Sequence, residues 1–127
     1  MYFHVMVGAN DIQASKKFYD ATFNALGVAS KGQFRADPEA YMYGDPSTGL
    51  FFITKPQDGQ AACHANGGTI MFKAKSKAEI DAWYNAGLAA GGKDDNGAPK
   101  PGGLPNTVVG YLRDPSGNKV AVITFTS

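Results

Sequence analysis

The residues of this sequence best suited to chemistry are its two histidines, His4 and His64, and its one cysteine, Cys63. An imidazole can act as a general base near neutral pH or as a metal ligand, and a thiolate can bind the same ion. His4 lies in a short run of β-type residues, and His64 lies five positions before Thr69, which opens a second such run. If the loop between them folds inward, His64 could join His4, with Cys63 as a third ligand.

Each of these residues also has a plainer interpretation. A loop histidine such as His64 commonly hydrogen-bonds backbone groups, and His4 without partner ligands is a hydrogen-bonding side chain in a cavity lining. Cys63 has no sequence neighbour that would activate its thiol, which favours an inert cysteine. No G-x-S-x-G nucleophile elbow occurs, and the Gly-Gly pairs at 67–68 and 91–92 lack the strand–glycine–helix setting of a dinucleotide site.

Composition bounds the class of protein. The 127 residues are 43% hydrophobic with a formal net charge of +1, which is typical of one folded domain. No block of like charge supports nucleic-acid or membrane-surface binding, and no apolar stretch approaches the roughly 20 residues of a membrane span. A single cysteine cannot form an internal disulfide, so we expect a cytoplasmic protein.

The elements that must position the histidines occur twice. The first module, about residues 1–55, begins with a strand over 2–7 and a helix capped by Asn10 or Asp11 and ended by Gly27. Weaker strands follow, and a hairpin over 42–54 closes this half. A linker rich in turn formers covers about residues 56–68.

The second module, about residues 69–127, repeats this order. A strand over 69–74 leads to the capping box of Ser76 and Glu79 and a helix that stops at the glycines at 91–92. Residues 97–106, rich in glycine and proline, predict a loop with no helix or strand of its own. We expect it to be the most mobile internal segment and to become ordered when a ligand binds. The last strands surround the tight turn at 114–118.

Subtraction of residue numbers supports the duplication. The pairs His4 and Thr69, Phe18 and Trp83, and Gly27 and Gly92 each differ by 65. The two Asp-Pro-Ser turns, at 45 and 114, differ by 69, and the two Ile-Thr pairs, at 53 and 123, differ by 70. Two copies of strand, helix and about three strands predict an α+β domain built of two tandem β-α-β-β-β modules with pseudo-symmetry.

Two motifs carry a resemblance to a known family. The helix reads D-I-x-x-S-x-x-F-Y-D over Asp11 to Asp20, and the closing hairpin reads R-D-P-S-G-N-K-V over Arg113 to Val120. With the paired modules, this resembles the vicinal oxygen chelate superfamily, which includes glyoxalase I, bleomycin-resistance proteins, fosfomycin-resistance enzymes and extradiol dioxygenases. The resemblance implies curved mixed sheets, paired modules that enclose a cavity, and a homodimer.

The resemblance also implies four metal-ligand positions, one on the first and one on the last strand of each module. Carried over by position, they fall on His4, Phe51, Thr69 and Ala121. Ala121 stands at the position of the family's final Glu, and the repeat offset of 70 makes Phe51 its equivalent in the first module. Of these four residues, only His4 has a side chain that can bind a metal ion. We therefore expect no protein-held metal and no other cofactor.

The same positions predict an apolar pocket. Strand alternation places Met6 beside His4, Met71 beside Thr69, and Arg113 on the face of Tyr111, so that these side chains line the cavity with Phe51 and Ala121. Arg113 could anchor a ligand anion, or pair with Asp114 or water. The alternative is that the apolar residues simply pack the core.

Two functions of different classes follow. The first is a metal-free module that binds an apolar or aromatic small molecule; a cationic drug is disfavoured because the cavity positions hold no carboxylate. The second is a lyase or isomerase of the glyoxalase type, with His4 as general base or with a metal completed by His64 or by the substrate.

Overall fold

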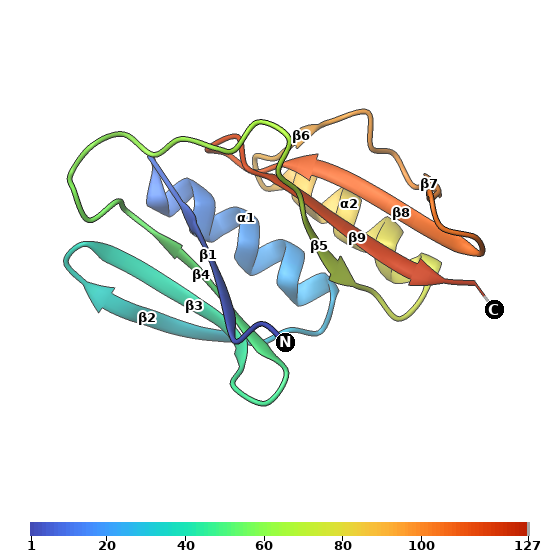
Figure 1. Ribbon diagram of the computed structural model, residues 1–127, viewed down its shortest axis with the longest axis horizontal. Coiled ribbons are helices and arrows are strands. Elements are labelled where there is room, and N and C mark those ends of the chain that lie inside the picture. Colours follow the sequence, from blue (N-terminus) through green and yellow to red (C-terminus); the bar gives the residue numbers. More distant parts are fainter. Residues whose placement is uncertain (127) are drawn as a thin grey trace.

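The computed structural model describes residues 1–126, which form two sheets and two helices (Figure 1). The elements of the first half are β1 (His4–Gly8), α1 (Ile12–Ala25), β2 (Ser30–Ala36), β3 (Glu39–Asp45) and β4 (Gly49–Thr54). Those of the second half are β5 (Ile70–Lys73), α2 (Lys77–Ala89), β6 (Lys93–Asp94), β7 (Lys100–Pro101), β8 (Thr107–Arg113) and β9 (Lys119–Phe125).

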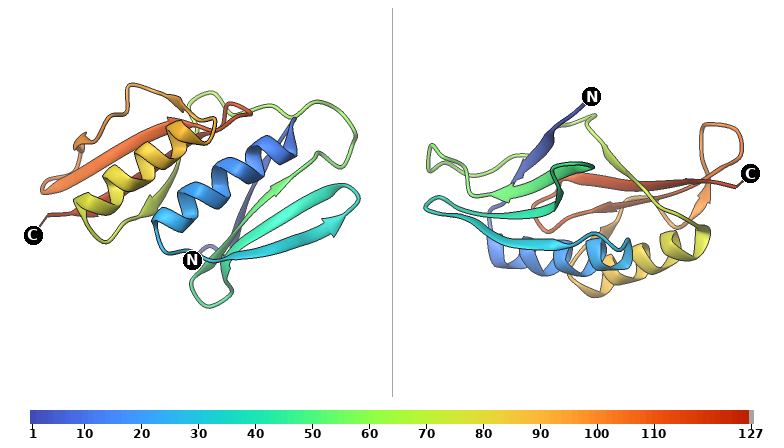
Figure 2. Two further views of the ribbon diagram at one scale, coloured as in Figure 1. Left: turned by 180° about the vertical axis from the view of Figure 1, so that it is seen from behind. Right: turned by 90° about the horizontal axis from the view of Figure 1, so that it is seen from below.

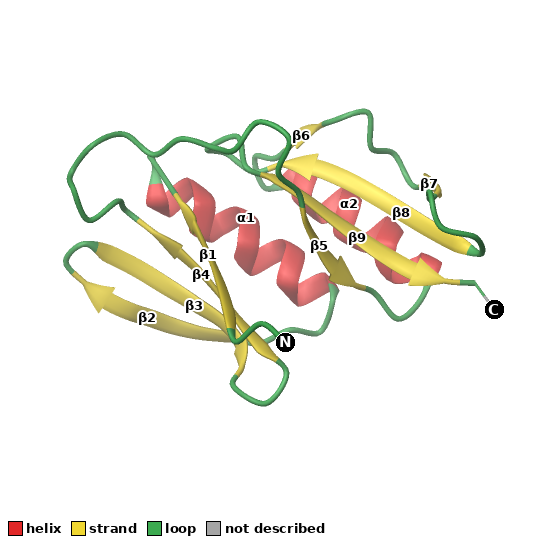
Figure 3. Ribbon diagram, viewed as in Figure 1, coloured by secondary structure: helices red, strands yellow, loops and turns green. Residues whose placement is uncertain are grey.

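Each half builds its own sheet with the same crossover. The first has the order β1-β4-β3-β2, and the second has the order β5-β9-β8-β6 with β7 also paired to β8. In both, the first strand runs parallel to the last, so the chain must cross over through its helix before the antiparallel strands form (Figure 3). The predicted α+β fold of two tandem β-α-β-β-β modules is therefore confirmed.

Both helices cover the same side of the two sheets and pack against each other, so that within residues 1–126 the opposite faces of the sheets have no covering layer (Figure 2). The core between helices and sheets is rich in aromatic rings, with Tyr19 of α1 4.9 Å from the ring centre of Phe51. Gly87 allows the close approach of α2, because a Cβ there would lie 2.3 Å from Leu112 and 3.2 Å from Phe18. No helix within residues 1–126 is long and apolar enough to cross a membrane.

Helix starts follow the predicted capping chemistry. Asp11 is the N-cap of α1 and accepts a hydrogen bond from the Ala14 amide at 3.1 Å. Asn10 instead holds the linker, because its side-chain oxygen accepts from the Ala62 amide at 2.8 Å. At α2, Ser76 accepts from the Glu79 amide at 3.2 Å. The caps thus supply acceptors for backbone amides in the first turn of each helix.

The segment 97–106 differs from the sequence prediction. It contains the strand β7, and the Gly97 carbonyl accepts from the Tyr111 amide at 3.0 Å while the Gly102 amide donates to the Thr107 carbonyl at 3.1 Å. Gly97 is buried, and a Cβ there would lie 2.1 Å from the Tyr111 carbonyl oxygen, so no larger residue fits. The prediction of a loop without any strand is wrong because backbone pairing with β8 overrides the turn-forming composition.

Candidate functional site

The uncovered face of the first sheet gathers aromatic and methionine side chains around His4. The imidazole meets the Phe52 ring edge-on at 5.1 Å between centres, and Phe34 meets the same ring at 4.8 Å. Met6 and Phe34 keep 39% and 51% of their surface exposed, and His4 is also exposed. Large apolar side chains left in solvent on one face indicate a surface that binds something.

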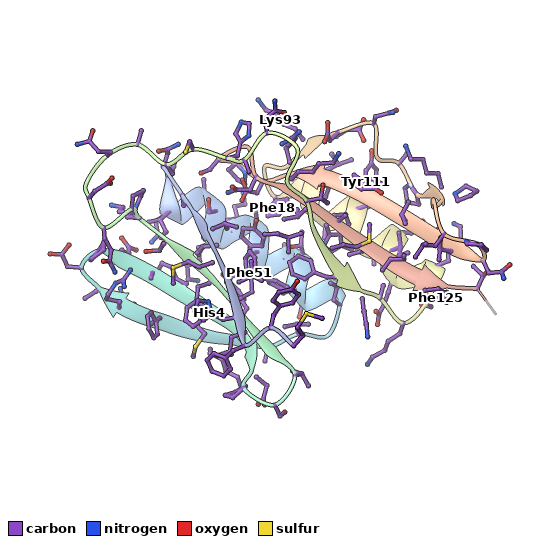
Figure 4. The ribbon with its side chains drawn as sticks, viewed as in Figure 1. His4, Phe18, Phe51, Lys93, Tyr111 and Phe125 are labelled. Atoms are coloured by element: carbon purple, nitrogen blue, oxygen red, sulfur yellow. The ribbon has the colours of Figure 1, made fainter. Side chains whose placement is uncertain are left out.

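Phe51 does not belong to this face. It is 4% exposed and packs in the core against Tyr19, Phe23 and Phe72, on the helix side of the sheet (Figure 4). The prediction that Phe51 lies on the His4 face is wrong, because the strand register pairs Phe51 with Val5, which packs on the core, and pairs Phe52 with Met6. A slip of one residue along a strand moves a side chain to the opposite face of the sheet.

The strand register gives the correct counterpart. Met6 pairs with Phe52 and Met71 pairs with Ala121, and Met6 and Met71 differ by the 65 residues of the repeat. Phe52 and Ala121 differ by 69, as the two Asp-Pro-Ser turns do. Phe52 is therefore the residue equivalent to Ala121, and sequence reasoning missed it although the turn offset contained the signal.

The second sheet brings together most of the remaining predicted residues. Met71, Ala121 and Tyr111 occupy neighbouring positions across β5, β9 and β8, on the face away from α2. Thr69 is exposed just before β5, and Met71 is 39% exposed. Ala121 is fully buried, so its methyl group lies beneath the neighbouring side chains of this face.

Cationic side chains surround Tyr111. The Lys119 and Lys100 ammonium groups lie 5.1 and 5.8 Å from the centre of its ring. Arg113 pairs with Asp95 through Nε and Oδ2 at 3.2 Å and donates to the Gly117 carbonyl at 3.0 Å, whereas sequence reasoning offered Asp114 or water as its partner. Sequence alone gave no signal for Asp95, because this pairing depends on where β6 joins β8.

His64 and His4 lie at opposite ends of β1. The His64 ring packs against Gly117, where an added Cβ would lie 2.6 Å from its Cδ2 atom, and the turn of Gly117 is tied to the Gly8 carbonyl by the Asn118 side chain at 3.0 Å. Since β1 rises about 3.3 Å per residue, His4 is about 13 Å further along the strand. The structure does not unite the two histidines, so a metal shared between them has no geometric basis.

Cys63 lies on the linker, exposed, beside a groove of about 390 Å³ that Met6, Gly8 and Thr54 also line. A second groove of about 500 Å³ runs along α1 and is polar. Tyr43 donates to Asp20 at that groove at 2.8 Å, and burial followed by this hydrogen bond raises the pKa of the Tyr43 hydroxyl well above its usual value. Neither groove contains the predicted residues of the second sheet.

The four positions that the resemblance marks for metal ligands do not fit a metal ion. With the corrected register they hold an imidazole at His4, a phenyl ring at Phe52, a hydroxyl at Thr69 and a methyl group at Ala121. Within residues 1–126, no three His, Cys, Asp or Glu side chains are grouped so that they could hold an ion. A divalent ion normally needs at least three such donors.

The closing turn joins the two halves of the molecule. Asp114, 2% exposed, accepts from the Tyr19 hydroxyl of α1 at 2.6 Å and from the Ser116 and Asn118 amides at 2.9 Å each. Burial, and then the Asp114 carboxylate, raise the pKa of Tyr19 well above its usual value. The turn thus fixes β9, and the face that includes Ala121, relative to the first half.

The family model of the glyoxalase/bleomycin resistance protein/dioxygenase superfamily matches residues 2–122. The chain therefore belongs to this superfamily. A comparison with curated proteins found no match.

Solved structures agree with this assignment. A glyoxalase/bleomycin resistance protein from Albidiferax ferrireducens is 42% identical, with 97% of each chain covered and a TM-score of 0.85. A lactoylglutathione lyase from Agrobacterium tumefaciens is 21% identical over 97% of this chain and 92% of the other, with a TM-score of 0.67. A variant of the fosfomycin resistance protein FosX from Listeria monocytogenes is 12% identical over 100% and 90%, with a TM-score of 0.70. The last two similarities are evidence for the fold alone.

Proposed function

We propose that this chain is a glyoxalase-like binding protein that holds an apolar or aromatic small molecule without a protein-bound metal. The observation that carries the proposal is the exposed aromatic and methionine surface around His4, with Phe52 at a position where metal-dependent relatives are expected to place a ligand. Covering a large apolar side chain contributes about 1.5–3 kcal/mol, so a few such contacts suffice for micromolar binding. We place this activity in the cytoplasm, as the single cysteine suggests.

A homodimer forms part of this proposal. The faces that carry Met6 and Met71 have no covering layer within residues 1–126, so one chain does not enclose the cavity that the resemblance implies. A second copy would supply the missing layer and bury the exposed apolar surface. Light scattering at micromolar concentration should give twice the mass of 13.4 kDa, and a monomeric mass would refute the dimer.

The neutral dye N-phenyl-1-naphthylamine tests the binding function, because its fluorescence rises in an apolar site. We expect saturable binding by the protein and an affinity about tenfold lower for Phe34→Ala, which removes an exposed ring that contacts Phe52. Leu88→Ala is the matched control, since Leu88 is 40% exposed on α2, on the other side of the molecule. Equal affinity for both variants would contradict the proposed location of the site.

The second candidate function, a glyoxalase-type lyase or isomerase, depends on His4 alone. Its imidazole is exposed on the proposed binding face, where a substrate proton could reach it, whereas His64 lies elsewhere. Formation of lactoylglutathione from methylglyoxal and glutathione, abolished by His4→Gln and retained by His64→Gln, would support the enzyme. If the wild-type protein shows no turnover, the enzyme function is refuted and ligand binding remains the proposed function of this face.

A further inference from the structure

The charged residues of the strands are sorted between the two faces of the sheets. On β5 to β9, the residues that share the face of Tyr111 and Ala121 include five cations, placed there by the register: Lys73, Lys93, Lys100, Arg113 and Lys119. Figure 4 shows Lys93 and Tyr111 over the same sheet. On the first sheet, Arg35 pairs with Ala40 on the open face and donates to the Thr54 hydroxyl at 2.7 Å.

The strand carboxylates take the opposite side. Glu39 accepts from Gln13 of α1, Asp94 accepts from Tyr84 of α2, and Asp45 alternates with the open-face position of Gly44. Thus six strand cations and no strand carboxylate occupy the open faces in the part of the chain that the structure describes. A chain of net charge +1 therefore presents one strongly cationic surface.

The centre of this cationic surface is apolar. The five cations of the second sheet share its open face with Met71, Ala121 and Ile123. The Tyr111 ring is held beneath the ammonium groups of Lys119 and Lys100. A cation over an aromatic face is attracted by the ring and is still able to bind an anion. An apolar centre with a cationic rim complements a molecule that has an apolar body and a negative charge.

Two carboxylates lie near this surface and oppose such a ligand. Asp95 is 3.2 Å from Arg113 and 3.6 Å from Lys119, so it neutralises part of the rim. Asp58 lines the linker groove on the side of the first sheet, with Met6. An incoming anion competes with Asp95 for Lys119, whereas Lys100, Lys93 and Lys73 are exposed around the rim.

We propose that the ligand of this face is an organic anion, with its carboxylate, sulfonate or phosphonate group at Lys119 and Lys100 and its aromatic or apolar body over Met71 and Ala121. The proposal rests on the function proposed above and narrows its ligand class. It disfavours a homodimer in which two second sheets face each other, because that contact would bring like charges together. The arrangement that fits both proposals is one in which the first sheet of one copy, with its His4 surface, faces the second sheet of the other.

A matched pair of dyes separates this proposal from the proposed function. 1-Anilinonaphthalene-8-sulfonate carries the anilinonaphthalene skeleton of N-phenyl-1-naphthylamine with an added sulfonate. We expect the anionic dye to bind about threefold to tenfold more tightly than the neutral dye at low salt, which is the effect of one or two charge contacts near a surface. Its affinity should fall with added sodium chloride, and the neutral dye should show no such fall.

Variants give effects of opposite sign. Lys119→Gln and Lys100→Gln should each weaken the anionic dye about threefold to tenfold and leave the neutral dye unchanged, whereas Asp95→Asn should tighten the anionic dye. Lys17→Gln, an exposed lysine on α1, is the matched control and should change neither dye. Circular dichroism of each variant confirms that it is folded.

Three results would overturn the inference. Equal affinity for both dyes, with no effect of the rim variants, refutes the anion preference and leaves the proposed function intact. No binding of the neutral dye refutes the proposed function itself. Tighter binding of a single-stranded oligonucleotide than of the anionic dye, lost in the same variants, refutes a small-molecule site in favour of nucleic acid.

Discussion

Replacing Asp114 by alanine should be among the most destabilising single changes outside the apolar core. The two Asp-Pro-Ser turns of the duplicated chain provide an internal comparison, because Asp114 is buried where its counterpart Asp45 is exposed. The sequences of the two turns are nearly the same, so a difference in stability must come from their surroundings. The perturbation therefore tests whether the closing turn joins the two halves of the fold.

The magnitude follows from the hydrogen bonds that would be lost. Without the carboxylate, the buried Tyr19 hydroxyl and the buried amide of Asn118 lose their acceptor, and so does the Asn118 side chain at 2.9 Å. Each buried donor left without a partner costs about 1–3 kcal/mol, and neighbouring losses are not additive. We expect Asp114→Ala to lower the free energy of unfolding by about 4 kcal/mol.

Asp45→Ala is the matched control. Asp45 accepts from the Ser47 amide at 2.9 Å and from the Ser47 hydroxyl at 2.6 Å, and water can replace it at this exposed turn. Its loss should cost less than about 1 kcal/mol. Urea unfolding followed by circular dichroism measures both values. Equal costs for the two aspartates would refute the role of the closing turn.

Three further predictions follow from the same contacts. Phe51→Ala should cost about 3–5 kcal/mol of stability yet leave dye affinity of the folded protein unchanged, whereas Phe52→Ala should weaken dye binding. Because the pKa of Tyr19 is raised, its contribution is full below pH about 10 and is lost as pH rises further, so Tyr19→Phe should flatten the alkaline part of a stability–pH profile. Gly97→Ala should cost about 1–3 kcal/mol by thermal unfolding, and Gly103→Ala, with no neighbour within 4 Å, should stay within about 0.5 kcal/mol.

Local chemistry was readable from the sequence wherever a side chain acts on its own neighbours. Asp11, Ser76 and the turn at 114–118 do what their residue types predict, because capping and turn formation depend on a few adjacent backbone groups. The rest of the fold followed from the duplication, because residues 65 apart matched each element of the first module with its equivalent in the second, which no local pattern could have done.

The site was less predictable because it depends on register. A repeat offset of 70 instead of 69 exchanged Phe52 for Phe51 and so exchanged the two faces of the sheet. The cationic rim could not be predicted from the sequence for the same reason. Lys73, Lys100 and Lys119 are far apart in the sequence, and only the pairing of β5, β7, β8 and β9 places them on one face.

The most direct test of metal-free ligand binding is a titration of N-phenyl-1-naphthylamine into protein dialysed against EDTA, repeated after addition of zinc, nickel or manganese. Because His4 is the only metal-binding side chain at the four expected positions, we predict that the binding curves with and without added metal superpose. Binding that is absent after dialysis and restored by one equivalent of metal would contradict the account.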